Sequence, residues 1–187
     1  MITLVSEDIY SFDLEEALKE ISEQRREQAL KFKYELGQRL CVLAYQLLKQ
    51  GLKDEYGITE NPVFVYNEHG KPSIEGHPEI CFNLSHCKEA AICVISDQPI
   101  GVDVESIREY KESLVNYTMN DEEVSLIKSA DNPAAAFIRL WTMKEATMKL
   151  IGTGISNDMK TVINTAKYKY STVCRDNYVY TNCATNI

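Results

Sequence analysis

The segment Ile100-Gly-Val-Asp-Val-Glu105 decides the fold, because its apolar residues alternate strictly with small or acidic ones. This alternation predicts a β-strand with one core face and one opposite face. The core face carries Ile100, Val102 and Val104, and the opposite face carries Gly101, Asp103 and Glu105. At a rise of about 3.3 Å per residue, the two carboxylates are attached roughly 6.6 Å apart and can reach one hard cation. Gly101 is expected to leave room for a ligand. The alternative is an ordinary strand face exposed to solvent.

A long helix is predicted downstream, over residues 133–151. Trp141, Glu145 and Lys149 lie one turn apart along a single stripe of this helix. A third carboxylate and a cation therefore share one helix face. The alternative is an exposed Glu-to-Lys pair that stabilises the helix, with Trp141 anchored in the core.

The rest of the pattern alternates between helical and extended stretches. Apolar spacing of three and four residues predicts helical structure from Asp13 to about Gly51 in two runs, with Gly51 as the cap of the second. Strands are expected at residues 63–66, 80–84, 90–96 and 100–106, a turn at Gly70-Lys71-Pro72, a capping box from Asn120 to Glu123, and a closing hairpin within residues 160–187; Gly152 and Gly154 are expected to end the long helix.

Helix followed by strands occurs twice along the chain. We therefore predict an α+β fold of two pseudo-symmetric α/β halves, each a small, mostly antiparallel sheet packed against a long helix. The expected halves are residues 1–98 and 99–187. Two fused halves also make a monomer a reasonable expectation.

Composition excludes several classes of protein. The chain has 187 residues, of which 44% are hydrophobic, so it can bury a substantial core. Its formal net charge of -8 argues against a nucleic-acid binder held by phosphate contacts. The start lacks a basic leader and no segment approaches roughly 18 apolar residues, so we expect a cytoplasmic protein without a membrane span. The six cysteines form no C-x-x-C pair and suggest no zinc site.

Two further segments carry chemistry. Phe82-Asn-Leu-Ser-His86 ends a predicted strand with an amide, a hydroxyl and an imidazole, a set that can bind phosphate. The stretch from Ser22 to Arg39 holds the densest cluster of cations in the chain. Taken alone, this basic stretch favours a solvated helix face with glutamate partners.

The order and combination of four segments resemble phosphopantetheinyl transferases of the surfactin-synthetase-activating type. These segments are Gly70-Lys-Pro72, Phe82-Asn-Leu-Ser-His86, Ile100-Gly-Val-Asp-Val-Glu105 and Trp141-Thr-Met-Lys-Glu145-Ala-Thr-Met-Lys149. The resemblance covers roughly residues 21–156. It implies a cleft between the two halves that binds coenzyme A, together with Mg²⁺ as cofactor. The implied reaction moves the phosphopantetheine arm onto a serine of an apo acyl or peptidyl carrier protein and releases adenosine 3′,5′-bisphosphate.

The resemblance also implies residue roles. Asp103, Glu105 and Glu145 are implied as magnesium ligands, a donor set that suits this ion. Glu145 is the implied acceptor of the serine proton, and Lys149 would stabilise charge on the pyrophosphate and the leaving group. Coenzyme A binding would fall to Arg25, Arg39, Lys71, Pro72, Ser85, His86, Asp103 and Lys149. On the strength of the resemblance, we interpret the basic stretch from Ser22 to Arg39 as a phosphate-binding segment rather than as a solvated helix face.

Some features depart from the family pattern. Gln28 replaces one cation of the phosphate-binding run, and the short stretch after the long helix predicts a trimmed second half. Because the chain is net negative, we expect an acidic carrier protein to dock through apolar contacts and a local basic rim. Two alternatives stay open: a magnesium-dependent hydrolase of nucleotide pyrophosphates such as coenzyme A, and a non-catalytic coenzyme A-binding protein. The sequence does not decide between fatty acid, polyketide and peptide synthesis.

Overall fold

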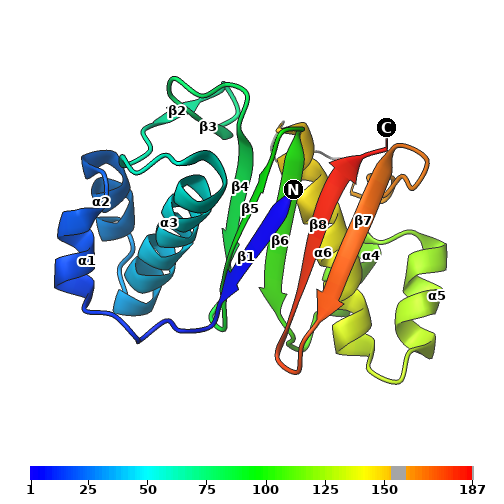
Figure 1. Cartoon of the computed structure of the whole chain (residues 1–187). Coiled ribbons are helices and arrows are strands. Elements are labelled where there is room, and N and C mark those ends of the chain that lie inside the picture. Colours follow the sequence, from blue (N-terminus) through cyan, green and yellow to red (C-terminus); the bar gives the residue numbers. More distant parts are fainter. Residues whose placement is uncertain (153–158, 187) are drawn as a thin grey trace.

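The computed structural model describes residues 1–152 and 159–186. Its elements form four layers, in which two three-stranded sheets lie between two long helices (Figure 1). Each sheet has one long helix on its outer face, and the inner faces of the two sheets pack together. The predicted α+β class with antiparallel sheets is confirmed.

The first sheet and its helices come from the N-terminal part of the chain. The elements are β1 (Ile2–Ser6), α1 (Leu14–Glu20), α2 (Glu23–Leu30), α3 (Glu35–Tyr56), β2 (Phe64–Tyr66), β3 (Pro72–Ile74), β4 (Cys81–His86) and β5 (Ala91–Ser96). The sheet has the antiparallel order β1-β5-β4, and β2 pairs separately with β3. Helix α3 buries Tyr45, Leu48 and Leu52 against Phe82 and Ile95 of the sheet.

The second sheet comes from the C-terminal part. Its elements are β6 (Ile100–Ser106), α4 (Glu112–Thr118), α5 (Asp121–Ser129), α6 (Pro133–Ile151), β7 (Tyr168–Cys174) and β8 (Tyr178–Thr185). The antiparallel order is β6-β8-β7. Helix α6 packs on this sheet through Ala146 and Leu150, which contact Cys183.

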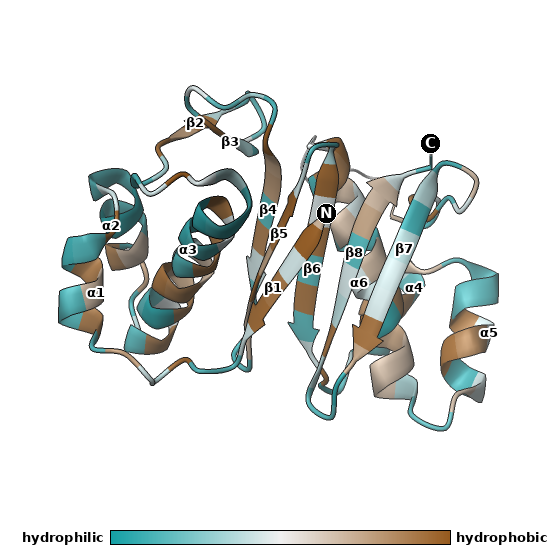
Figure 2. Cartoon of the chain, viewed as in Figure 1, coloured by the Kyte–Doolittle hydropathy of each residue, from teal (hydrophilic) through white to brown (hydrophobic). Residues whose placement is uncertain are grey.

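The centre of the molecule is the apolar contact between the two sheets. Ile92 and Val94 of β5 pack against Ile100, Val102 and Val104 of β6, and all five are almost completely buried. Figure 2 shows this concentration of hydrophobic residues on β1, β5 and β6, whereas α1 and α2 at the outside are largely hydrophilic. The strict alternation in β6 thus places its apolar residues between the sheets, as predicted.

Several predicted elements are confirmed. The hairpin at the end of the chain is formed by β7 and β8, and Asn120 forms a capping box with Glu123 at the start of α5. Helix α6 has the predicted bounds, is capped by Asn132, and ends at Gly152, whose φ of 74° is favourable only for glycine. Gly154, the second predicted end signal, lies outside the described residues.

The helical prediction for the N-terminal part was wrong in two respects. Three helices form where two apolar runs were predicted, because the Ser22 side chain accepts a hydrogen bond from the Arg25 amide and starts α2 as a separate helix. Gly51 does not cap α3, which continues to Tyr56 and ends at Gly57 with φ 69°. Gly51 is instead a packing position, since a Cβ there would lie 2.5 Å from Ile95 Cδ1.

Strands β1 and β3 and helix α4 were not predicted. Strand β1 pairs with β5 along its whole length and completes the first sheet. Residues 97–99 separate the strands of the two sheets, although the division into two domains between residues 98 and 99 stays a prediction. Within the described residues, none of the helices is both long enough and apolar enough to cross a membrane.

Candidate active site

A cavity of about 580 Å³ lies where β4, β6 and α6 come together. Its lining combines Asp103, Glu105, Glu145 and Lys149 with Arg25, Ser85, His86 and Pro72, so it contains most of the predicted site residues. A second cavity of about 260 Å³ adjoins it and includes Lys71, Pro72, Glu145 and Lys149. The structure therefore gathers residues from both sheets, from α2 and from α6 around one space.

An ion pair joins the strand and the helix at this cavity. Lys149 Nζ lies 2.6 Å from Asp103 Oδ1 and donates a second hydrogen bond to Ser85 Oγ at 2.9 Å. Ser85 in turn donates to Asp103 Oδ1 at 3.1 Å. Asp103 is only 4% exposed, so this pair is well shielded from water. The alternative of a solvated strand face is wrong, because α6 covers that face of β6.

Gly101 was wrongly expected to leave room for a ligand. A Cβ at Gly101 would lie 2.1 Å from the carbonyl oxygen of Ala146 and 2.6 Å from the amide nitrogen of Leu150. The missing side chain therefore lets the backbone of α6 approach β6 closely. This approach brings Glu145 and Lys149 to Asp103.

Asp103 keeps one free oxygen for a ligand. Oδ1 is bound by Lys149 and Ser85, whereas Oδ2 is buried and has no hydrogen-bond partner among the described residues. A buried carboxylate oxygen without a partner is costly, so such an atom calls for an explanation such as a bound ion. Asp103, Glu105 and Glu145 all line the cavity and supply the hard oxygen donors that Mg²⁺ prefers.

The described residues contain no group of three acidic, histidine or cysteine side chains close enough to hold a metal ion by themselves. Mg²⁺ keeps several waters and is commonly bound by one or two carboxylates together with substrate phosphate. An incomplete set of protein donors therefore fits this ion, provided that a phosphate ligand supplies the rest.

Glu105 and Glu145 both have raised pKa values. Burial is the main cause for each, and the negative charge of Asp103 adds to it. Arg108 lies 3.3 Å from Glu105 and, with Lys149, partly opposes the shift in the pKa of Glu105. A glutamate with a raised pKa is a better proton acceptor near neutral pH than an ordinary carboxylate.

His86 and Arg25 also line the larger cavity. Burial, together with the positive charges of Arg25 and Lys149, lowers the pKa of His86 to about 4. Arg25 donates two hydrogen bonds from its guanidinium to the carbonyl oxygen of Cys41, which fixes the side chain at the cavity. The Arg25 guanidinium therefore adds positive charge to the cavity and is suited to an anionic ligand.

Two predicted coenzyme A contacts have other partners in the structure. Arg39 does not line either cavity; its guanidinium pairs with Glu35 and donates to the carbonyl oxygen of Phe12. Lys71 lines the smaller cavity, where its ammonium donates to the carbonyl oxygen of Leu150 at 2.7 Å. Burial lowers the pKa of Lys71. A role for either side chain in binding stays a prediction.

Comparison with known proteins agrees with this arrangement. Residues 99–180, which contain β6, α6 and most of the second sheet, match the 4′-phosphopantetheinyl transferase superfamily. This part of the chain is therefore similar to that superfamily. The chain is 30% identical over 139 residues to the 4′-phosphopantetheinyl transferase psf-1 of Bacillus pumilus, and the match covers 73% of this chain and 60% of the relative.

Two other relatives give a similar picture. The 4′-phosphopantetheinyl transferase Sfp of Bacillus subtilis strain 168 is 30% identical over 73% of this chain and 62% of its own length. The transferase gsp of Aneurinibacillus migulanus is 36% identical over 51% of this chain and 40% of its own length. The matches thus cover only part of each of these superfamily members.

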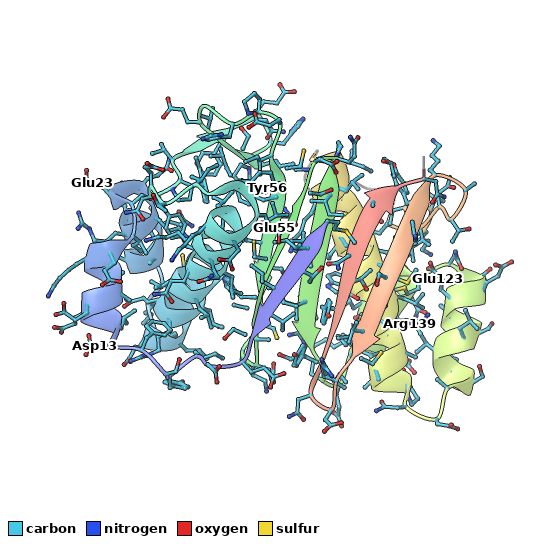
Figure 3. All side chains as sticks on the ribbon, in the orientation of Figure 1. Asp13, Glu23, Glu55, Tyr56, Glu123 and Arg139 are labelled. Carbon is cyan, nitrogen blue, oxygen red and sulfur yellow. The ribbon has the colours of Figure 1, made fainter. Side chains whose placement is uncertain are left out.

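The sequence analysis missed two residues in or next to this site. Asn83 lines both cavities, although only its neighbours Ser85 and His86 were singled out in the same segment. Lys144, next to Glu145, is buried and forms an ion pair with Glu123 of α5. Figure 3 labels Glu123. The pair spans 21 residues of sequence, so helix periodicity could not reveal it.

Proposed function

We propose that this chain transfers the phosphopantetheine arm of coenzyme A to a serine of an apo acyl or peptidyl carrier protein, and that it acts as a monomer. The observation that carries the proposal is the meeting of Asp103, Glu105, Glu145 and Lys149 at one cavity. Three acids, Lys149 and Arg25 around one cavity suit a diphosphate held together with a divalent cation. The names of the related transferases support the same activity.

In the proposed reaction, the serine hydroxyl attacks the β-phosphorus of coenzyme A. The new bond joins the serine oxygen to this phosphorus, and the bond to the adenosine bisphosphate breaks. Glu145 accepts the serine proton, for which its raised pKa is suited. Lys149 stabilises negative charge on the diphosphate and the leaving group.

The remaining residues bind and orient the substrate. Asp103, Glu105 and Glu145 would hold Mg²⁺, which when bound neutralises and polarises phosphate oxygens. Arg25 and His86 bind the 3′-phosphate, and Pro72 and Lys71 contact the adenine nucleotide. Ser85 orients Asp103 and Lys149 through its two hydrogen bonds, in addition to its predicted phosphate contact.

The test is incubation of the protein with coenzyme A, magnesium and a panel of apo carrier proteins. Mass spectrometry should show one carrier gaining the phosphopantetheine mass on its serine. The variant Glu145→Gln should lose transfer while largely keeping its affinity for coenzyme A. Glu16→Gln, which changes an exposed residue of α1, is the matched control and should transfer normally. Near-normal transfer by Glu145→Gln would remove Glu145 from the chemistry.

The same experiment separates the alternative functions. A hydrolase would release phosphopantetheine into solution and leave every carrier unmodified. A non-catalytic binder would retain intact coenzyme A. Either result would refute the proposed transfer.

A further inference from the structure

Asn83 joins the two sheets at the point where the cavities meet. The backbone of β6 pairs with β8 on one side, and on the other side it receives side chains from β4. The Val102 amide donates to Asn83 Oδ1 at 2.9 Å, and the Val104 amide donates to Ser85 Oγ at 3.2 Å. These bonds satisfy amides that an unpaired strand edge would otherwise leave without acceptors.

The bond from Val102 fixes the orientation of the Asn83 amide. Because a backbone N–H is a donor, the Asn83 atom that faces it must be the oxygen. The Nδ2 group is therefore committed to the other direction as a donor. Within residues 1–152 and 159–186 it has no hydrogen-bond partner, and it is not among the unpartnered atoms that are buried from solvent.

Asn83 as a whole is only 6% exposed, and it lines both cavities. Its free donor therefore faces the cavities rather than open solvent. The two cavities also share Pro72, Leu84, Glu145 and Lys149. A ligand that extends from one cavity into the other therefore passes the residues that line both, which include Asn83 and Lys149.

The two cavities differ in chemistry. Asp103, Glu105, Arg25 and His86 line only the larger one, whereas Gly70, Lys71, Met148 and Gly152 line only the smaller one, and Glu145 and Lys149 line both. A charged group is best accommodated at their boundary, where Lys149 lies. A neutral amide donor there can orient an anionic oxygen without adding charge, and hydrogen bonds to ionised acceptors are stronger than neutral ones.

We propose that Asn83 Nδ2 donates a hydrogen bond to a diphosphate oxygen of coenzyme A, while its Oδ1 holds β6. The inference rests on the proposed function, since it assigns a further binding residue to the same site. It gives Asn83 two roles, one between the sheets and one toward the ligand.

Calorimetry with two ligands tests the proposal. Coenzyme A carries the diphosphate, whereas adenosine 3′-monophosphate has the base, ribose and 3′-phosphate without it. Asn83→Asp keeps the acceptor for Val102 and replaces the donor by an anionic oxygen. We expect this variant to bind coenzyme A at least roughly tenfold more weakly and to change affinity for the monophosphate less than about twofold.

A second variant guards against misfolding. Asn83→Ser removes the donor and leaves space for water beside Val102, and it should weaken coenzyme A binding selectively, by about threefold to tenfold. Asn182→Ser is the matched control. Asn182 is also 6% exposed and also joins the sheets, through a hydrogen bond to Thr3, but it lines neither cavity. This control should bind coenzyme A normally.

The outcomes separate the two proposals. If the unaltered protein does not bind coenzyme A, the proposed function fails. If it binds and both Asn83 variants keep its affinity, only the role of Asn83 is refuted. An equal loss for both ligands would also refute that role, because the contact would then not be with the diphosphate.

Discussion

Replacing Lys144 by methionine is expected to destabilise the fold strongly. Lys144 is 0% exposed, and its ammonium donates to Glu123 Oε1 at 2.8 Å and to the carbonyl oxygen of Met159 at 2.7 Å. Removing one partner of a buried ion pair costs about 3–5 kcal/mol, because the other charge stays buried without compensation. Glu123 also accepts the Asn120 amide, which favours the lower end of this range.

A loss of about 3 kcal/mol lowers the melting temperature by roughly 6–12 °C in a protein of this size. Thermal unfolding followed by circular dichroism measures the shift. The double variant Lys144→Met with Glu123→Met should recover much of the loss, since neither charge is then left alone.

The exposed pair of Lys19 with Glu16 provides the control. Lys19→Met removes a surface ion pair of similar length and should change stability by less than about 1 kcal/mol. If Lys144→Met melted within about 2 °C of the unaltered protein, the ammonium would not be compensating a buried charge. The proposal that the ion pair of Lys144 with Glu123 holds α5 against α6 would then be refuted.

Three other predictions concern the cavity. Asp103→Ala should weaken magnesium binding in the presence of coenzyme A by at least about tenfold, and unchanged affinity by calorimetry would contradict its role as a ligand. Gly101→Ala should lower the free energy of unfolding by about 3 kcal/mol, because the added Cβ would collide with the Ala146 carbonyl. The control Gly57→Ala, at φ 69° in open space, should lower it by only about 1 kcal/mol. Equal losses in urea unfolding would argue against the close approach of α6. Because the pKa of His86 falls from 6.5 to about 4 on folding, the unfolded chain takes up the proton first as pH decreases. The stability that this group contributes is present above pH 6.5 and is lost as pH falls towards 4. His86→Phe should flatten that part of the stability profile, and an unchanged slope would count against a buried neutral imidazole.

The sequence predicted the elements whose patterns are long and periodic. Strand β6 alternates over its whole length, and α6 begins with Asn-Pro and ends at Gly152, so both were predicted with correct bounds. The acids of the candidate site were predicted because they lie on these two elements. Their meeting at one cavity depends on Gly101, whose absent side chain the sequence analysis assigned to a ligand.

Other features depend on contacts that no local pattern records. Gly51 has the sequence position of a helix cap, but it lies inside α3, where it packs against Ile95 and Leu4. Strand β1 is short and becomes recognisable only through its pairing with β5. The free donor of Asn83 likewise depends on an amide 19 residues away in sequence.

The two-residue spacing of Asn83 and Ser85 on β4 matches that of Val102 and Val104 on β6. Inserting one residue between either pair would turn the second partner to the wrong side of its strand, because side-chain direction reverses at every step. The alignment of β4 with β6 thus depends on these four positions, in addition to the length of the loop that connects the sheets. Natural insertions and deletions should therefore spare these four positions.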